Sequence, residues 1–211
     1  MELNDYLMES KSDILFHSGD FTMSGTISEV IDFHDWFVSL PHPHKIIIAG
    51  NHDRCLGQDG ILGMKIFTDC HYLQNSGVTI EDKKIWGSPM TPSFNGMREG
   101  LAFYNKREKM IWSDIPKDLD VLLTHGPPWG ILDEVLEYNK DLLGMHKENV
   151  GDKMLLSKVI QKKPKIHSFG HLHECYGVLE NIKYAPNTTF INCSVVNEQY
   201  DVINEPIEID I

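Results

Sequence analysis

Four short apolar segments of this chain each run into a loop that carries histidine, aspartate or asparagine. The segments are residues 14–16, 46–49, 121–123 and 165–169, and the loops after them contain the sequences HSGD, GNHD, THGPP and GHLH. Short runs rich in branched apolar residues that stop at glycine and polar residues are typical of buried strands. In α/β sheets, ligands bind beyond the carboxyl ends of the strands. The pattern therefore predicts that the four loops converge on one site.

The spacing of the other apolar residues indicates an α/β protein. Residues 27–37 have apolar side chains at helical spacing, so this helix and the first two strands are expected to form a β-α-β unit. Further helices are expected over residues 101–113 and 149–163. Shorter strands are expected in the segments 72–73, 78–80, 84–87, 176–179, 189–195 and 207–211.

The length and composition suit one compact unit, which we expect to be a single domain over residues 1–211 with a hydrophobic content of 41%. No apolar stretch approaches the roughly 18 residues of a membrane span. The N-terminal sequence MELNDYLMESKSD is acidic where a secretory signal is basic and then apolar, so a cytoplasmic location is expected. The four cysteines lack the paired spacing of a zinc framework and are expected to be free thiols.

The net charge limits the kinds of partner that the chain binds. The formal net charge is −12, with 19 Lys and Arg against 31 Asp and Glu. Non-specific binding of nucleic acid depends on basic side chains that neutralise phosphates, so we do not expect it here. A small phosphorylated substrate remains compatible with the acidic chain, because bound divalent cations reverse the local field.

The residues in the four loops are suited to holding divalent metal ions. The candidate ligands are Asp20, Asn51, His125, His171 and His173. Carboxylate, amide and imidazole ligands together suit Mn, Fe or Zn better than Ca, and Mn²⁺ is the favoured ion. His171 and His173 are two residues apart, so on an extended chain both rings point to one side. A lone Gly-Asp or His-x-His is a weak signal, but packing does not readily explain all four loops in this order.

Two metals about 3.5–4 Å apart would hold a hydroxide for in-line attack on phosphorus. His52 is then expected to be the catalytic residue that stabilises charge or protonates the leaving oxygen, with Asp53 orienting its ring. Asn95 and Trp129 lie in neighbouring loops and are candidate contacts to a base or sugar of the substrate. Packing within those loops accounts for both residues equally well.

The motifs HSGDFT, KIIIAGNHD, IWGSPMTPSFN, THGPPWGILD and KPKIHSFGHLHECYG resemble the calcineurin-like metallophosphoesterase superfamily. The resemblance runs from about residue 13 to the C-terminus and is closest to the branch typified by the metallophosphoesterase-domain brain proteins. It implies a four-layer α/β/β/α sandwich of two mixed sheets with a metal site at the strand ends. It also implies hydrolysis of phosphodiesters or phosphomonoesters, with 3′,5′-cyclic nucleotides as a substrate class.

The resemblance also assigns roles to single residues. Asp20 would bridge two metals, and Asn51, His125 and His171 would complete one metal site. His173 would belong to the other metal site. His52 would be the catalytic histidine of the family.

The chain departs from the family pattern at its start. The family begins with a strand that ends in Asp-x-His and supplies two further ligands, and that strand is missing from this sequence. The string Asp69-Cys70-His71 occupies a different segment and is not a substitute. One metal site therefore has its full ligand set, and the other has only Asp20 and His173. The chain would then bind one metal ion instead of two. A late start site, a shortened variant and a one-metal relative are the three explanations, and we favour an incomplete N-terminus.

Three functions remain open at this point. The first is a metal-dependent phosphoesterase, which the retained His52 favours. The second is a catalytically impaired member of the same fold that binds metal or nucleotide or serves as a scaffold, which the absent Asp-x-His favours. The third is a metal-dependent nuclease, which suits the chemistry but not the acidic balance of the chain.

Overall fold

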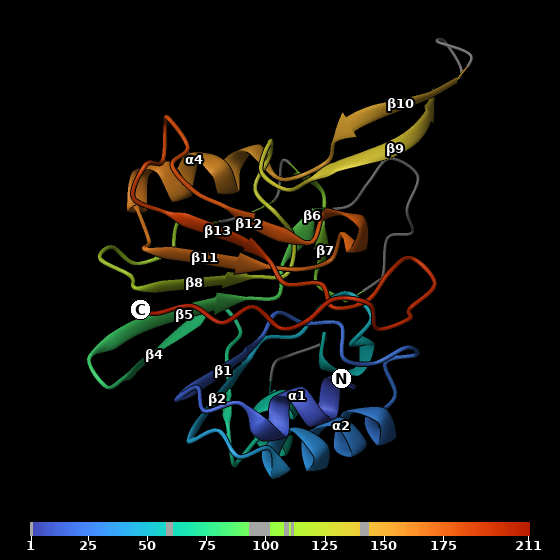
Figure 1. Ribbon diagram of the computed structural model, residues 1–211, viewed down its shortest axis with the longest axis vertical. Helices are drawn as coiled ribbons and strands as arrows, with labels where there is room; N and C mark the ends of the chain where they lie inside the picture. The colour runs from blue at the N-terminus through green and yellow to red at the C-terminus, as the bar shows by residue number, and fades with distance from the viewer. Residues whose placement is uncertain (1, 58–60, 93–101, 108–109, 111, 140–143) are drawn as a thin grey trace.

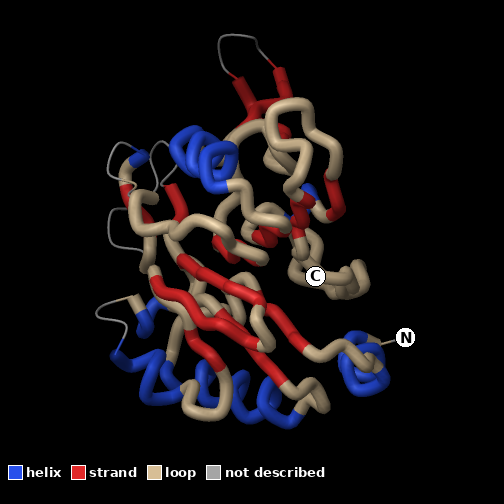
Figure 2. Tube along the Cα trace, turned by 90° about the vertical axis from the view of Figure 1, so that its left-hand side faces the viewer, coloured by secondary structure: helices blue, strands red, loops and turns tan. Residues whose placement is uncertain are grey.

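Two β-sheets face each other in the middle of the molecule, and helices cover their outer faces (Figure 1 and Figure 2). The structure is a computed structural model. It describes every residue except 1, 58–60, 93–101, 108–109, 111 and 140–143. The smaller sheet consists of three parallel strands in the order β1-β2-β3, which are β1 (Ile14–His17), β2 (His44–Ile47) and β3 (His71–Tyr72).

The larger sheet has six strands in the order β12-β13-β11-β8-β5-β4. Its four central strands are parallel to one another, and the strands at both edges are antiparallel to their neighbours. The strands are β4 (Ser76–Ile80), β5 (Lys83–Ser88), β8 (Val121–Thr124), β11 (Ile166–Phe169), β12 (Gly177–Leu179) and β13 (Thr189–Asn192). The parallel centre places the carboxyl ends of β8 and β11 side by side.

Two further strand pairs lie outside these sheets. Strands β6 (Thr91–Pro92) and β7 (Tyr104–Asn105) form a short parallel pair, and β9 (Glu134–Asn139) and β10 (Gly144–Asn149) form an antiparallel hairpin. The helices are α1 (Leu3–Glu9), α2 (Ile27–Ser39), α3 (Ile61–Ile66) and α4 (Lys153–Lys162), with 3-10 turns η1 (Arg54–Leu56) and η3 (His173–Cys175). The β9–β10 hairpin projects from the end of the molecule that α4 covers (Figure 1).

Alternation along β2 and the residues after it shows how the layers are held together. Ile46 and Ile48 point between the sheets, whereas Ile47 and Ala49 pack with the buried side chains of α2. Successive side chains of a strand point to opposite faces, so one apolar run serves two cores. Leu155 of α4 packs on the outer face of the larger sheet in the same way. The apolar run of residues 46–49 is thus continuous because both faces of the smaller sheet are buried.

The α/β class predicted from the sequence is confirmed, and three details of the prediction are wrong. The described strands of the smaller sheet are all parallel, so that sheet is not mixed. The described part of residues 101–113 contains β7 and turns instead of a helix, because Ala102 and Phe103 are buried in the core beneath α2. Residues 207–211 form no strand. Ile207 and Ile211 pack on the core between the sheets without strand pairing.

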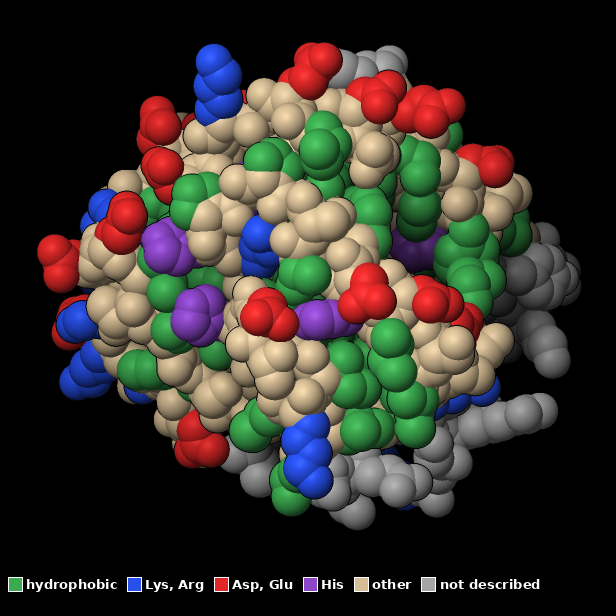
Figure 3. All heavy atoms as spheres, turned by 90° about the horizontal axis from the view of Figure 1, so that it is seen from below, with side chains coloured by type: hydrophobic (Ala, Val, Ile, Leu, Met, Phe, Trp, Pro, Cys, Tyr) green, Lys and Arg blue, Asp and Glu red, His purple; other side chains and the backbone are tan. Residues whose placement is uncertain are grey.

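Two surface properties bear on the partners of the chain. Within the described residues, no helix combines the length and apolar character needed to cross a membrane. On the face shown in Figure 3, Lys and Arg side chains are scattered singly among Asp and Glu and do not form a continuous basic patch. That face therefore lacks the electrostatic footprint of a nucleic-acid binder.

The buried His167 of β11 is expected to make stability depend on pH. The Thr124 hydroxyl donates to the Gly126 carbonyl at 2.8 Å, so it accepts a hydrogen bond from Nε2–H of His167 at 2.9 Å. Nδ1 is then the unprotonated nitrogen, and it is buried with no hydrogen-bond partner among the described residues. A second proton would face the rings of Phe169 and Phe190, and burial lowers the pKa of His167 to about 3.

Because the pKa of His167 is lower in the folded chain than in the unfolded one, the unfolded state takes up the proton first as pH falls. Stability is complete above about pH 6.5 and decreases between pH 6.5 and about 3, on the order of 1 kcal/mol per pH unit. Urea unfolding of the parent and of His167→Leu at pH 7.5, 6.0 and 5.0 checks this. A His167→Leu variant with the same pH slope as the parent would contradict the prediction.

Candidate metal centre

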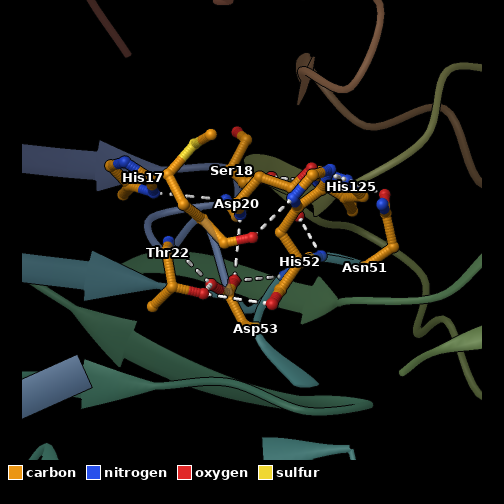
Figure 4. A network of polar contacts seen from close by, with 11 residues as sticks. His17, Ser18, Asp20, Thr22, Asn51, His52, Asp53 and His125 are labelled. Carbon is orange, nitrogen blue, oxygen red and sulfur yellow. Dashed lines mark hydrogen bonds and ion pairs between the residues drawn. The ribbon is translucent and has the colours of Figure 1, made fainter. Parts of the chain in front are cut away.

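The two sheets contribute opposite halves of one polar cluster. Asp20 and Asn51 follow β1 and β2 of the smaller sheet, whereas His125 and His171 follow β8 and β11 of the larger sheet. Asp20, His125 and His171 each offer a ligand atom, and these atoms lie within 4.8 Å of one another. Figure 4 shows Asp20 and Asn51 directed toward His125. The structure therefore brings these four predicted residues together at the carboxyl ends of the strands.

The hydrogen bonds of His125 determine which ring nitrogen faces the cluster. Its Nδ1 lies 2.9 Å from the carbonyl oxygen of Ser18, which only accepts, so Nδ1 carries the proton. Its Nε2 lies 2.9 Å from Oδ1 of Asn51 and 3.1 Å from Oδ2 of Asp20. In the neutral ring, the lone pair of Nε2 thus faces two oxygen acceptors. A proton or a cation is needed between them, and this donor set fits a divalent metal.

The electrostatics of the pair agree with that requirement. Burial opposes protonation of His125, but the Asp20 carboxylate beside it raises the pKa of the ring. Burial also acts against the charge of Asp20, yet His125 and the hydrogen bond from the His52 backbone hold the pKa of this carboxyl well below its usual range. Asp20 is therefore ionised at neutral pH and attracts positive charge to this point.

His171 is suited to being a neutral ligand. Its ring centroid lies 4.9 Å from that of His125 in an edge-to-face arrangement. Burial, followed by the neighbouring His125, lowers the pKa of His171 to about 3. A ring that stays neutral keeps a lone pair on one nitrogen, which is the form that binds metals.

The backbone of the cluster is strained at two of its side chains. Asp20 has φ of 58° and His171 has φ of 70°, both in the left-handed region that residues with a Cβ rarely adopt. A Cβ at Gly50 would overlap the side chain of Asp20 and the ring of His125. Such conformations persist where surrounding contacts fix them, and they concentrate at functional sites.

Asp53 holds the two loops of the smaller sheet together. Its buried carboxylate accepts hydrogen bonds from the backbone of Gly50 at 2.7 Å and of Asp20 at 3.0 Å. It also accepts from the backbone and the hydroxyl of Thr22, at 3.1 and 2.9 Å. Burial, and then the nearby Asp20 charge, raises the pKa of Asp53 to about 7. Its carboxylate thus binds these loop groups, whereas the ring of His52 has another partner, and the orienting role of Asp53 stays a prediction.

That partner is the backbone of Met23. Nδ1 of the His52 ring lies 3.2 Å from the Met23 carbonyl oxygen, while the His52 backbone N–H donates to Oδ1 of Asp20 at 2.7 Å. Nδ1 therefore carries the proton that it donates to Met23, and Nε2 is the other nitrogen of the ring. The catalytic role of His52 stays a prediction, and the bond to Asp20 ties its backbone to the cluster.

The contacts of His173 and Trp129 differ from those of the cluster. His173 begins η3, and its Nδ1 lies 2.9 Å from the carbonyl oxygen of Asn197. Among the described residues, the group within 4.8 Å does not include His173. Trp129 carries the Lys153 ammonium over its ring at 4.9 Å, so substrate binding there stays a prediction. Asn95 lies outside the described residues.

Tyr200 lies near the site, and the sequence analysis did not predict it as a site residue. The ring of Tyr200 lies 5.3 Å from that of His173 and 6.2 Å from that of His52, measured between centroids. Tyr200 is far from His52 in the sequence, and four residues separate it from the predicted strand over residues 189–195. Two signals cover it: the polar stretch Asn197-Glu-Gln-Tyr-Asp is typical of a turn, and the motif FINCSVVNEQY belongs to the resemblance to the family.

Comparisons with known proteins agree with this geometry. The family model described as Calcineurin-like phosphoesterase matches residues 1–175. The human protein named Metallophosphoesterase domain-containing protein 1 is 36% identical over 227 residues, which cover 94% of this chain and 64% of the relative. The chain thus spans a little under two thirds of that relative's length.

Solved structures show the same fold at low identity. One crystal structure has a TM-score of 0.65 at 14% identity and covers 91% of this chain and 83% of its own. The crystal structure of TT1561 of Thermus thermophilus has a TM-score of 0.58 at 12% identity, with coverage of 87% and 77%.

Proposed function

The chain belongs to the calcineurin-like phosphoesterase family, and on that premise we propose that it is a metal-dependent hydrolase of phosphodiesters or phosphomonoesters, with 3′,5′-cyclic nucleotides as a candidate substrate class. The observation that carries the proposal is the set of facing acceptors in the cluster. Oδ1 of Asn51 and Oδ2 of Asp20 lie 2.9 and 3.1 Å from Nε2 of His125. Such a set needs a positive charge at its centre.

Asp20, Asn51, His125 and His171 would hold one divalent ion, for which Mn²⁺ is favoured and Fe or Zn are alternatives. A bound ion of this kind polarises a phosphoryl oxygen and lowers the pKa of water, which supplies a nucleophile at neutral pH. His173 would contribute to a second ion. The fixed positions of the strand ends mean that these side chains need little rearrangement to act together.

His52 would act on the substrate itself. Its backbone is held by Asp20 and its ring by the Met23 carbonyl, so the ring is oriented before substrate arrives. With Nδ1–H donated to Met23, the ring would act as an acid in its imidazolium form, in which Nε2 carries a second proton that it gives to a leaving oxygen or directs at charge developing on the phosphoryl group.

His52→Ala is expected to lower kcat for bis-p-nitrophenyl phosphate with Mn²⁺ by about 100- to 10,000-fold, the usual worth of a general acid. Mn²⁺ affinity should stay within about threefold, because His52 is not one of the proposed ligands. Steady-state kinetics and calorimetric titration with Mn²⁺ measure the two effects. His44→Ala is the control, since His44 begins β2 at the end opposite the site. A His52→Ala rate equal to that of the parent would remove the proposed mechanism.

One observation favours the second candidate, a catalytically impaired member of the fold that binds metal or nucleotide. His173 lies outside the 4.8 Å group of Asp20, His125 and His171. Elemental analysis of the Mn²⁺-loaded protein, combined with the rate of bis-p-nitrophenyl phosphate hydrolysis, distinguishes the two candidates. A metal content near one ion per chain without Mn²⁺-dependent hydrolysis would support the impaired member. Metal-dependent turnover would exclude it.

A further inference from the structure

The turn over residues 197–201 lies against two of the site histidines. Val196 and Val202 form an antiparallel bridge at its base. Oδ1 of Asn197 accepts the backbone N–H groups of Gln199 and Asp201, each at 2.9 Å. The backbone N–H of Asn197 donates to the Asp201 carbonyl at 2.9 Å. A turn closed by this many bonds holds its side chains in fixed directions.

The turn contacts His173 through its backbone. The Asn197 carbonyl accepts from the Tyr200 N–H at 3.0 Å and lies 2.9 Å from Nδ1 of His173. Since a carbonyl only accepts, Nδ1 of His173 carries the proton and Nε2 carries the lone pair. The Asn197 carbonyl thereby fixes both the tautomer and the ring orientation of His173.

The turn contacts the rings through Tyr200. The Tyr200 ring makes edge-to-face contacts with His173, at an interplanar angle of 80°, and with His52, at 66°. Tyr200 has φ of 65°, a conformation that bulky side chains rarely adopt. The turn therefore holds Tyr200 in a strained conformation in which one ring contacts both histidines.

We propose that the 197–201 turn is a positioning element in which Tyr200 and Asn197 set the orientations of the His52 and His173 rings. The kinetic consequences of this inference rest on the proposed function, because they require His52 to act on the substrate in a fixed orientation. Tyr200 acts through His52 and His173 and is a positioning residue. Mispositioning a reacting group by about 1 Å costs up to about 100-fold in rate.

The kinetic test uses two matched pairs in the full chain. Tyr200→Leu removes the ring and Tyr200→Phe retains it. Asn197→Ala opens the turn and Asn197→Asp keeps an acceptor for both backbone N–H groups. With bis-p-nitrophenyl phosphate and Mn²⁺, kcat should fall about 10- to 100-fold in Tyr200→Leu and Asn197→Ala, with KM within about twofold. Tyr200→Phe, Asn197→Asp and the exposed control Glu198→Ala should stay within about threefold of the parent.

A second measurement does not depend on activity. The imidazole proton resonances of His52 and His173, followed by NMR in metal-free protein, should shift and broaden in Tyr200→Leu but not in Tyr200→Phe. Unchanged resonances in Tyr200→Leu would overturn the proposal, as would an unchanged kcat in an active protein. If the parent chain does not hydrolyse the substrate, the proposed function fails, while the NMR comparison still decides whether the turn positions the two rings.

Discussion

Asp20→Asn is expected to weaken Mn²⁺ binding strongly and, with it, to slow hydrolysis of bis-p-nitrophenyl phosphate. The substitution keeps the size of the side chain and keeps Oδ1, which accepts the backbone N–H of His52 at 2.7 Å. It removes the negative charge that faces Nε2 of His125 at 3.1 Å. Residues that only support a metal ligand cost about 10- to 100-fold in affinity when they are changed, so loss of a charged ligand should cost at least about 100-fold.

Calorimetric titration with Mn²⁺ and elemental analysis measure the loss, and the rate should fall at least as far as the affinity when Mn²⁺ is limiting. Asp32→Asn on the exposed side of α2 is the control for the change of one charge. Circular dichroism should show that Asp20→Asn remains folded. A folded Asp20→Asn protein that binds Mn²⁺ like the parent would show that the cluster is not the metal site.

Asp53→Ala is expected to have the largest effect on stability, about 3–5 kcal/mol in the free energy of unfolding. The buried carboxylate accepts four hydrogen bonds from Gly50, Asp20 and Thr22, and alanine removes the acceptor of their three backbone N–H groups, while the Thr22 hydroxyl can still donate to the His52 carbonyl at 3.1 Å. Asp53→Asn keeps the shape and one acceptor oxygen but directs an amide N–H₂ toward other donors, so its loss should be smaller than that of alanine.

Urea unfolding with EDTA present measures this effect without a contribution from bound metal. Asp32→Ala is the matched surface control and should change the free energy of unfolding by less than about 0.5 kcal/mol. An Asp53→Ala protein within about 1 kcal/mol of the parent would show that the two loops are held by other contacts. In that case Asp53 would have to be explained by catalysis.

The sequence was most informative where pattern and chemistry coincide. The apolar runs that end at Asp20, Asn51, His125 and His171 predicted the strands and their convergence, because buried parallel strands must end at a common edge. The helix predicted over residues 101–113 is wrong because their apolar spacing also suits a strand and turns that bury Ala102 beneath α2. For short apolar runs, tertiary packing overrides local pattern.

Residue patterns could not predict contacts that depend on the conformations of the loops. The sequence places Asp53 beside His52, yet the carboxylate turns toward the N–H groups of Gly50 and Thr22. The contact of Tyr200 with His52 depends on a turn about 150 residues away, since the chain must return to the site after β13. Such contacts require knowledge of the fold and of the loop conformations.

The division of the cluster between the two sheets has a mechanical consequence. Asp20 and Asn51 belong to one sheet and His125 and His171 to the other, so an ion held by all four would be a cross-link between the halves of the molecule. A ligand that binds only the folded chain adds stability with its free concentration, by about 2.7 kcal/mol at 100 times its dissociation constant. The free metal concentration around the protein would then determine how strongly the two sheets are held together, as well as the rate of hydrolysis at the site.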